Sequence, residues 1–374
     1  MNILILDESY PSPENLYGDV FVHVRAKEYQ KRGHTVTILQ FFKKTPPYVF
    51  EGIPVESVDN VNDVISTFQR IAPDVVAIHF FHRDLHPFVA QLEVPCFVWV
   101  HGYEATGWYR RLFNFGFSDW IHLRTIVQQN LIQQWQFRKL TTFATRSGKL
   151  SFIFPSAWLR RTVETDTGTT LPRAHVVPNP ISTKTFPYVE KHPDQVRKFL
   201  SIRPYTTRKY ANDITVDFIL SLRSKPYFRD LTFTLCGHGA LFDRTVKPLR
   251  ALPNVTLINR FLSHAEVGIA HRDHGIFLCP TRQDSQGVSS CEAMASGLVP
   301  FSSNNSAVPE FIQHGVTGFL HSRVSEMVQN YETLLNDTDL FMKMSRSASL
   351  FVQRTCDLEV IVGRELAMFM NVSK

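Results

Sequence analysis

The sequence contains few cysteines and none of the patterns that use them in pairs. Among its 374 residues are five cysteines, and no two of them form a Cys-x-x-Cys pair. All five lie in apolar or helical surroundings, which predicts reduced thiols in a cytosolic protein and argues against a disulfide framework or a zinc site. They are Cys96, Cys236, Cys279, Cys291 and Cys356.

Long apolar segments are also missing. No run of about 18 apolar residues is present, so we expect no helix that spans a membrane. The first residues, MNILILDESYP, form a short apolar run that ends in acids, which is typical of a buried strand and not of a signal peptide. We therefore expect a cytoplasmic protein that contacts the inner face of the cell membrane at most peripherally.

The common motifs of metal and nucleophilic catalysis are absent as well. The sequence has no Gly-x-Ser-x-Gly, no Walker loop and no His-Glu-x-x-His. Its one Asp-x-Asp, at 337–339, lies among helical residues far from any expected strand end, and we interpret it as the start of a helix. We therefore expect neither a metal ion nor another bound cofactor.

Positive charge is concentrated in one segment. The chain carries a net charge of +6, and residues 105–150 hold seven basic residues against one acid, Asp119, while the rest is balanced. The same segment is rich in aromatic residues, namely Trp108, Tyr109, Phe113, Phe115, Phe117, Trp120, Trp135, Phe137 and Phe143. Basic residues mixed with aromatics suit an anionic membrane surface. The expected contact residues are Arg110, Arg111, Arg138 and Lys139.

Residues 105–150 allow two other interpretations, of which the first stays open and the second is not expected. The segment fits equally well a helical subdomain whose aromatic side chains belong to the core. The composition would also suit nucleic acid, which we do not expect as a partner.

Strands and helices alternate along the chain. The expected strands are short continuous apolar runs, as in parallel sheets buried on both faces. They are Ile3–Leu6, Thr35–Phe41, Val75–Phe80, Cys96–Val100, Ser151–Phe154, Ala174–Val177, Val196–Ile202, Leu231–Leu235, Val255–Asn259, Ile276–Cys279 and Leu298–Phe301. The expected helices include Val20–Arg32, which Gly33 ends, and Val61–Ile71.

A proline-rich stretch, Pro178–Asp194, marks a domain boundary. We expect an N-terminal Rossmann-like domain at 1–182, a C-terminal one at 183–358, and a separate helix at 359–374 that is free to pack back on the first domain. The fold class is therefore α/β, with two doubly wound sheets.

Ligands of such sheets bind beyond the carboxyl ends of the strands, and unusual residues recur there. Gly18 and Asp19, His79, His101-Gly102, Arg203, Gly237-His238-Gly239 and Asp284 all follow expected strands. Two sheets whose functional edges face each other would form a central cleft for a ligand with two ends.

Two cations stand on the loop after the first strand of the second domain. Arg203 and Lys209, in SIRPYTTRKY, would neutralise a diphosphate and stabilise it as a leaving group. Arg208 competes for the second place. The alternative is a solvated basic loop.

The stretch QDSQGVSSCEAMASG places two carboxylates around a glycine turn. The amides of Gly287, Val288 and Ser289 at a helix start would bind phosphate oxygens, and Glu292 would accept hydrogen bonds from ribose hydroxyls. Ser289-x-x-Glu292 also reads as a capping box, which in isolation is the favoured interpretation.

Asp284, before that turn, would contact the hydroxyls of a sugar, or is an ordinary turn aspartate. His101 would donate to a sugar hydroxyl or a phosphate from the first domain. The alternative is a loop histidine without a role.

At these residues the chain resembles the family 4 retaining glycosyltransferases of GT-B fold. GDVFVHVRAKEYQKRGHTVTIL is similar to the family's first loop and helix, and VPCFVWVHGYE to its histidine-glycine strand. FPSAWLRRTV and HVVPNPISTKTF resemble its serine strand and its linker, and SIRPYTTRKY its phosphate clamp. CPTRQDSQGVSSCEAMASGLVPFSSNNSAVPEFIQHGVTGFL resembles the acid-x7-acid block, the most specific of these motifs. They occur in the family's order over most of the chain.

The resemblance implies a role for each matched residue. Asp284 would contact the donor sugar, Glu292 the ribose, and Arg203, Lys209 and the amides of Gly287 to Ser289 the diphosphate. Gly18 and Gly237 would let the backbone approach the donor, His101 would reach the sugar near its anomeric carbon, and the base would pack near Asn259–Leu262.

Several positions depart from the family's pattern. The first acid is usually Glu and is here Asp284, and the Gly-Phe after it is Ser285-Gln286. The second glycine of the family's first loop is here Asp19, which we expect to contact the acceptor instead. The glycine before the clamp arginine is Ile202, and the glycine after the clamp lysine is Tyr210.

The implied function is transfer of a sugar, with retention, from a nucleotide diphosphate sugar to a glycan or lipid-linked acceptor in bacterial cell-surface polysaccharide synthesis, such as lipopolysaccharide or capsule. A UDP-sugar is favoured and a GDP-sugar is second. The alternatives are a GT-B epimerase or hydrolase of nucleotide sugars, which would form product without an acceptor, and a non-catalytic protein that binds glycans or nucleotide sugars.

Overall fold

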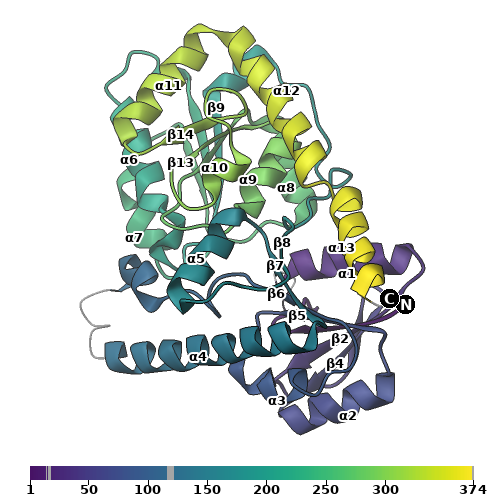
Figure 1. The fold of residues 1–374 in the computed structure, drawn as a ribbon. Coiled ribbons are helices and arrows are strands. Elements are labelled where there is room, and N and C mark those ends of the chain that lie inside the picture. The colour runs from purple at the N-terminus through teal and green to yellow at the C-terminus, as the bar shows by residue number, and fades with distance from the viewer. Residues whose placement is uncertain (14, 16–17, 116–121, 373–374) are drawn as a thin grey trace. The chain divides into compact units, whose positions relative to one another are not determined.

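The computed structural model describes residues 1–13, 15, 18–115 and 122–372, and the chain forms two compact units. Unit 1 comprises Met1–Pro180 together with Leu358–Lys374, and unit 2 comprises Ile181–Asp357. The first change of unit falls inside the proline-rich stretch, and the second falls directly before the last helix (Figure 1).

Unit 1 is built on an eight-stranded sheet in the order β3-β4-β2-β1-β5-β6-β7-β8. All neighbours pair in parallel except β3 and β4, which form an antiparallel hairpin at one edge. The elements are β1 Asn2–Asp7, α1 Val20–Lys31, β2 Thr35–Phe41, β3 Tyr48–Phe50, β4 Ile53–Val58, α2 Val61–Ile71, β5 Val75–His79, η1 Arg83–Leu85, α3 His86–Val89, β6 Cys96–Trp99, η2 Trp108–Asn114, α4 Leu123–Ser147, β7 Leu150–Phe154, α5 Ala157–Thr167, β8 Ala174–Val176 and α13 Leu358–Val372.

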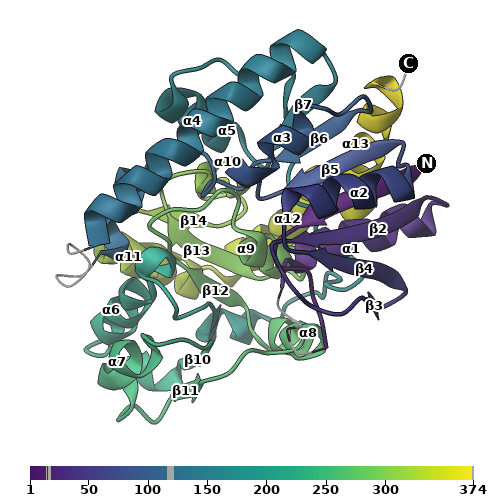
Figure 2. The same cartoon turned by 90° about the horizontal axis from the view of Figure 1, so that it is seen from below.

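Both faces of this sheet are covered, which explains why its central strands are continuous apolar runs. One core contains side chains of α2, α3, α4 and α5, and the other contains side chains of α1 and α13. Figure 2 shows α2 and α3 on the near side of the sheet. The last helix of the chain therefore completes the core of the first unit.

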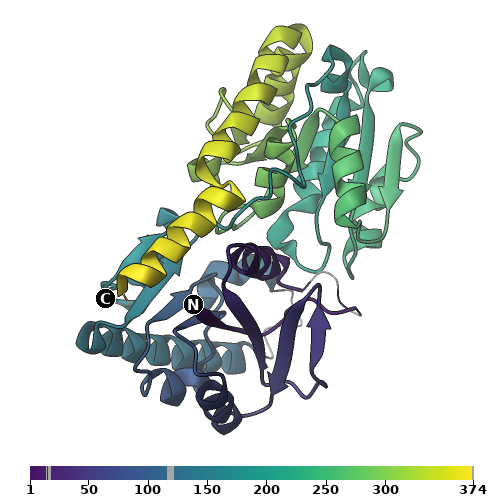
Figure 3. The same cartoon turned by 90° about the vertical axis from the view of Figure 1, so that its right-hand side faces the viewer.

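Unit 2 is built on a six-stranded, wholly parallel sheet in the order β11-β10-β9-β12-β13-β14. Its larger core lies under α6, α11 and α12, and Figure 3 shows α12 along one side of this unit. The elements are η4 Pro193–Arg197, β9 Lys198–Ile202, η5 Arg208–Tyr210, α6 Asn212–Leu222, η6 Phe228–Asp230, β10 Thr232–Cys236, α7 Phe242–Val246, η7 Lys247–Leu249, β11 Val255–Ile258, α8 His264–Asp273, β12 Ile276–Cys279, α9 Val288–Ala295, β13 Val299–Ser303, α10 Val308–Phe311, β14 Phe319–His321, α11 Val324–Asn336 and α12 Thr338–Thr355.

The predicted strands and helices are confirmed as elements, with differences at their ends. The strand expected from Val196 begins at Lys198, because Pro193–Arg197 forms a 3-10 turn. The strands β3, β4 and β14, of three, six and three residues, were not predicted. The expected helix start at Asp337 is confirmed, since its carboxylate accepts a hydrogen bond from the amide of Leu340 at 2.8 Å.

Within the described part of the chain, none of the helices combines the length and the apolar character that crossing a membrane requires. Among the same residues, no group of three or more His, Cys, Asp or Glu is arranged to hold a metal ion.

Candidate active site

Arg203 lies at the carboxyl end of β9, at the centre of the sheet of unit 2. Its side chain is only 4% exposed. The guanidinium Nη1 donates to Ser289 Oγ at 2.8 Å, and Nη2 lies 3.8 Å from Asp284 Oδ2, too far for a hydrogen bond. Within the described residues, Nε and Nη2 are buried and have no hydrogen-bond partner. Unsatisfied donors on a buried cation are costly, so this group favours an anionic ligand.

The ring of Tyr210 joins the two predicted clamp cations. Arg203 Cζ lies 4.9 Å from the ring centroid, and Lys209 Nζ lies 5.7 Å from it. Lys209 is half-buried, whereas its competitor Arg208 has an exposed side chain. The geometry therefore associates Lys209 with Arg203 through an aromatic face. The residue that departs from the family's glycine supplies that face.

The loop before α9 is shaped by Asp284. Its Oδ1 accepts from the amides of Gln286 at 3.2 Å and Gly287 at 2.8 Å. The turn-aspartate interpretation therefore holds for this oxygen, while Oδ2 faces Arg203. Gly287 is the N-cap of α9 with φ +83°, a left-handed conformation that favours glycine.

The capping-box interpretation of Ser289 and Glu292 is wrong. In the described part of the chain no side chain caps α9, because its N-cap is Gly287 and Ser289 already lies inside the helix. Ser289 instead accepts the hydrogen bond from Arg203. The amides of Val288 and Ser289 lie in the first turn of α9, where an anion would meet the positive end of the helix dipole.

Glu292 lies one turn further along α9. Its carboxyl is half-buried, and burial raises its pKa to about 8. Among the described residues we find no hydrogen bond or ion pair that holds this carboxyl. A carboxyl in such surroundings is available to hydroxyl donors of a ligand.

Gly237 directly follows β10, the strand beside β9. Its φ is +155°, and a Cβ atom here would lie 1.9 Å from the carbonyl oxygen of Arg203. Glycine is therefore required for the close approach of the two strand ends. His238, next in the chain, is exposed, and its Nδ1 lies 3.0 Å from Asn259 Oδ1.

In unit 1, His101 follows β6 within a column of rings. Its ring centroid lies 4.3 Å from that of Phe80, 5.0 Å from that of Phe21 and 5.4 Å from that of His79. Burial, with a smaller contribution from Arg25, lowers the pKa of His101 to about 3. The imidazole is therefore neutral at physiological pH.

His79, at the end of β5, determines which nitrogen of His101 carries the proton. Nδ1 of His79 lies 3.1 Å from Nε2 of His101, and Nε2 of His79 is buried without a hydrogen-bond partner in the described chain. A buried N–H without a partner costs more than a buried lone pair, so the proton of His79 belongs on Nδ1. His101 then accepts at Nε2 and presents an N–H at Nδ1.

Glu104 holds the turn that carries His101. Its Oε1 accepts from the amide of His101 at 2.5 Å, and its Oε2 accepts from the amide of Gly102 at 3.0 Å. Burial raises the pKa of Glu104 to about 7. This residue, three positions after the histidine in HGYE, was not predicted as part of the site.

Gly18 and Asp19 precede α1 in the same unit. A Cβ atom on Gly18 would lie 2.3 Å from the carbonyl oxygen of Ser9, so the glycine permits a close approach of two chain segments. Asp19 is the N-cap of α1, but its side chain caps no amide. Burial raises the pKa of Asp19 to about 7. The carboxyl of Asp7 beside it is fully buried, and both burial and the neighbouring charge of Asp19 raise its pKa.

The basic aromatic segment is partly core and partly surface. Phe137 is fully buried, whereas Trp135 is 52% exposed. Arg110 pairs with the buried carboxylate of Asp166 at 2.6 Å, and Arg138 donates to the carbonyl of Thr167. Two further predicted contact residues lie over aromatic rings, with Arg111 Cζ 4.3 Å from the centroid of Tyr103 and Lys139 Nζ 3.5 Å from that of Trp135. Phe117, Asp119 and Trp120 lie outside the described residues.

The structure thus groups the predicted residues by unit. Arg203, Lys209, Gly237, Asp284, Gly287, Val288, Ser289 and Glu292 gather at the carboxyl ends of β9, β10 and β12 in unit 2. In unit 1, Phe21, two residues after Asp19, packs on His101, so the first loop and the histidine turn are neighbours.

Comparison with known proteins agrees with this arrangement. Residues 202–337 match the family model described as glycosyl transferases group 1. No curated protein matches the chain in sequence.

Several solved structures share the fold. Sucrose-phosphate synthase from Thermosynechococcus elongatus superposes with a TM-score of 0.77 at 12% identity, covering 99% of this chain and 98% of that one. HepE of Anabaena, solved with UDP and glucose, gives 0.72 at 15% identity, covering 99% and 100%. WaaG, a glycosyltransferase involved in lipopolysaccharide biosynthesis, gives 0.67 at 13% identity, covering 99% of both chains.

The chain therefore has the GT-B fold with two Rossmann-like units, as the sequence predicted. The family match over residues 202–337 supports a glycosyltransferase.

Proposed function

We propose that the protein is a retaining glycosyltransferase of family 4 that uses a nucleotide diphosphate sugar. The observation that carries the proposal is Arg203, a buried cation with two unsatisfied donor nitrogens beside the first turn of α9. A diphosphate satisfies both features, because its oxygens accept from the guanidinium and from the helix amides. Glu292, one turn along the same helix, then receives the ribose hydroxyls of the same ligand.

The residues of unit 2 take complementary roles in this proposal. Arg203 and Lys209 neutralise the charge that develops on the departing diphosphate, which removes the need for a metal ion. Asp284 contacts hydroxyls of the donor sugar through Oδ2, because Oδ1 already accepts the amide hydrogen bonds of the turn. The base packs against the backbone of residues 259–262.

In the reaction, the bond between the anomeric carbon and the phosphate oxygen breaks. The acceptor oxygen bonds to the same face of that carbon, so the configuration is retained. The acceptor proton passes to the departing phosphate oxygen. His101 contributes an N–H to a sugar hydroxyl or phosphate oxygen, and Asp19 binds the acceptor.

UDP is the favoured nucleotide and GDP the second candidate. The similarity to HepE of Anabaena, solved with UDP and glucose, supports this choice. The similarity to WaaG supports an acceptor from cell-surface polysaccharide synthesis, such as lipopolysaccharide or capsule.

A lipid-linked acceptor would bring the protein to the inner face of the membrane. One face of α4 suits contact with an anionic surface, because its exposed positions carry apolar and basic side chains. Leu131, Ile132 and Trp135 are 55%, 45% and 52% exposed. Four basic side chains of the same helix are also exposed, namely Arg124, Arg138, Lys139 and Arg146. Each lies seven residues, or two helical turns, from one of these apolar residues or from another of the basic residues, so all seven side chains lie on one side of the helix.

The test measures nucleotide release from UDP-glucose and from GDP-mannose, with and without extracted lipid-linked glycans. The proposal predicts release that depends on the acceptor, with an α-linked sugar in the product. Conversion of the donor at the same rate without any acceptor would instead identify an epimerase or hydrolase. Binding of the nucleotide without turnover under all conditions would identify a non-catalytic protein.

A further inference from the structure

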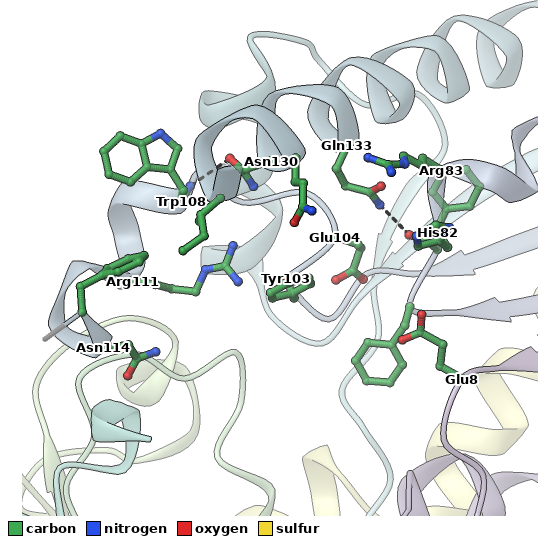
Figure 4. A pocket seen from close by; sticks show the side chains of 15 residues that line it. Glu8, His82, Arg83, Tyr103, Glu104, Trp108, Arg111, Asn114, Asn130 and Gln133 are labelled. Atoms are coloured by element: carbon green, nitrogen blue, oxygen red, sulfur yellow. Dashed lines mark hydrogen bonds between the residues drawn. The ribbon is translucent and has the colours of Figure 1, made fainter. Parts of the chain in front are cut away.

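Unit 1 contains a cavity of about 600 Å³ that the nucleotide site does not use. Its walls come from the loops after β1, β5 and β6, from η2 and from one face of α4 (Figure 4). The volume lies in the range of small-molecule sites. All the residues that line it belong to unit 1, so the cavity exists within that unit alone.

Aromatic side chains form a large part of the wall. Tyr103 is 74% exposed although it is a large aromatic residue, and Figure 4 shows its ring across the middle of the cavity. Phe80, Phe81 and Trp108 add further aromatic surface. Aromatic faces of this kind pack against the C–H faces of sugar rings, whose edges carry the hydroxyl groups.

The helix α4 contributes amide side chains to the opposite wall. Gln133 Nε2 donates to the carbonyl of Phe81 at 2.8 Å, which fixes the side chain and leaves its Oε1 available as an acceptor. Gln129, one turn earlier on the same face, is exposed and has no hydrogen bond to another described residue. Asn130, by contrast, accepts from the amide of Trp108 and donates to the carbonyl of Thr106.

The cavity also holds a cation without a counter-ion. Arg111 is half-buried over the ring of Tyr103 at 4.3 Å, and among the described residues no carboxylate forms an ion pair with it. Its neighbour Arg110 is different, because two of its nitrogens bind Asp166 at 2.6 and 2.7 Å. Burial lowers the pKa of Arg111 and outweighs the opposing effects of Tyr103 and Glu104.

Among the described residues, neither acid that lines the cavity forms an ion pair with this cation, although the charge of Glu104 acts on it from a distance. Both oxygens of Glu104 are occupied by the amides of His101 and Gly102. Glu8 is exposed, and Figure 4 shows it on the side of the cavity away from Arg111. Arg83, the second cation that lines the cavity, lies at the other end, and its Nε is 3.7 Å from Asp84 Oδ1. Among the described residues Arg111 is therefore the lining cation without a carboxylate beside it, and Glu8 and Gln133 offer acceptors for hydroxyl groups.

We propose that this cavity binds a saccharide that carries an anionic group, either a carboxylate or a phosphate. Arg111 binds the anion, Tyr103 stacks on the sugar ring, and Gln129, Gln133 and Glu8 take the hydroxyl groups. The inference rests on the proposed function only where it identifies this saccharide as the acceptor. It deepens that function by naming an acidic or phosphorylated sugar as the acceptor class.

The experiment compares glucuronate, glucose 6-phosphate, methyl glucoside and inorganic phosphate as probes of the full-length protein. Saturation-transfer NMR gives the relative affinities. We expect at least one anionic sugar to bind about tenfold more tightly than both methyl glucoside and inorganic phosphate. Preference for glucuronate identifies a carboxylate as the group recognised, and preference for glucose 6-phosphate identifies a phosphate.

Two matched variants connect binding to the cavity. Arg111→Gln should reduce the affinity for the anionic sugar about tenfold and leave methyl glucoside unchanged. Arg146→Gln removes an exposed arginine from the far end of α4 and should change neither. Equal binding of charged and neutral sugars, or an Arg111→Gln protein that binds like the wild type, would overturn the inference.

The same samples are titrated with UDP, so that the two proposals fail separately. Anionic-sugar binding without UDP binding retains the cavity assignment and removes the glycosyltransferase. UDP binding without sugar selectivity does the reverse. Melting temperatures of both variants, together with their UDP affinities, show that a loss of sugar binding does not come from unfolding.

Discussion

Nδ1 of His79 lies 3.1 Å from Nε2 of His101, at the carboxyl ends of two adjacent strands of unit 1. The two imidazoles are stacked at an interplanar angle of 21°, and the ring of His79 also stacks on that of Trp99. Because this contact fixes the tautomer, His79 acts as a positioning residue for the N–H that His101 presents at Nδ1.

The tautomer can be changed by substitution of His79. In His79→Asn the side-chain N–H still donates to His101, so we expect turnover within about threefold of the wild type. His79→Asp can only accept, which draws the proton to Nε2 of His101, and turnover should fall about tenfold or more. Nitrogen-15 shifts of the His101 imidazole report the tautomer directly. A wild-type protein protonated at Nε2 of His101 would contradict this assignment.

The clamp predicts different results for neighbouring cations. Arg203→Ala should lower kcat by about a hundredfold or more, because a buried donor set aimed at the leaving group is removed. Arg208→Ala, an exposed arginine on the same loop, is the control and should leave kcat within about twofold. Steady-state kinetics with the identified donor measure both. Equal losses in the two variants would refute the selective role of Arg203.

Nucleotide binding should release a proton from Glu292. The pKa of this carboxyl is about 8 in the folded protein against an ordinary 4.5, so it is mostly protonated at pH 7. The raised pKa means that its contribution to folding stability is present below pH 4.5 and is lost as the pH rises through about 8. Ribose hydroxyls favour the carboxylate, and binding therefore expels the proton.

Calorimetric titration with UDP in buffers of different ionisation enthalpy measures this release. We expect close to one proton at pH 7 and almost none at pH 9. Glu292→Gln binds more weakly and should release no proton at either pH. Equal proton release from this variant and the wild type would assign the proton to another group.

The last helix is attached to unit 1 by a buried ion pair. Arg25 Nε lies 3.2 Å from Glu365 Oε1, both side chains are fully buried, and Tyr29 donates to Oε2 at 2.5 Å. Glu365→Gln leaves the arginine without its counter-charge and should cost about 3–5 kcal/mol of unfolding free energy. Urea unfolding followed by tryptophan fluorescence, to which Trp99 beside Arg25 contributes, measures this cost.

A double variant separates charge from packing. Arg25→Met with Glu365→Leu removes both charges and keeps the volume, and its stability should lie much closer to that of the wild type. A double variant as unstable as Glu365→Gln would show that the pair contributes beyond mutual neutralisation.

The membrane proposal concerns the exposed face of α4. One double variant removes two apolar side chains, Leu131→Ser with Trp135→Ser, and the other removes two basic ones, Lys139→Ser with Arg146→Ser. Each should weaken binding to anionic vesicles severalfold, while binding to neutral vesicles stays low. Arg110 is left intact, because its ion pair with Asp166 holds the local fold. Co-sedimentation with vesicles is the measurement, and unchanged sedimentation of both double variants would exclude this face.

Much of the architecture could be predicted because the pattern is local. Apolar runs such as Cys96–Trp99 indicate a strand buried on both faces wherever they occur, and Gly33 ends α1 through its own backbone geometry. The strands β3 and β14, with three residues each, carry too little periodic signal.

The parts of the site that depend on distant contacts could not be predicted. The pairing of Arg25 with Glu365 joins positions 340 residues apart, and no spacing rule reports it. Ser289 could be either the capping residue of α9 or part of a ligand site, and the sequence does not decide between them. The fold does, because it makes Gly287 the N-cap. Tyr210 was identified only as a departure from the family's pattern, whereas its ring contacts both Arg203 and Lys209.

The central claim is that the Arg203 site binds a nucleotide diphosphate. The most direct measurement is the thermal shift of the protein with saturating UDP, GDP, dTDP, ADP and CDP in the absence of metal. A ligand at about 100 times its Kd adds about 2.7 kcal/mol of stability, so the account predicts a clear rise in Tm with one nucleotide, first of all UDP. The rise should disappear in Arg203→Ala. No shift with any of the five nucleotides would contradict the diphosphate site and with it the proposed glycosyltransferase.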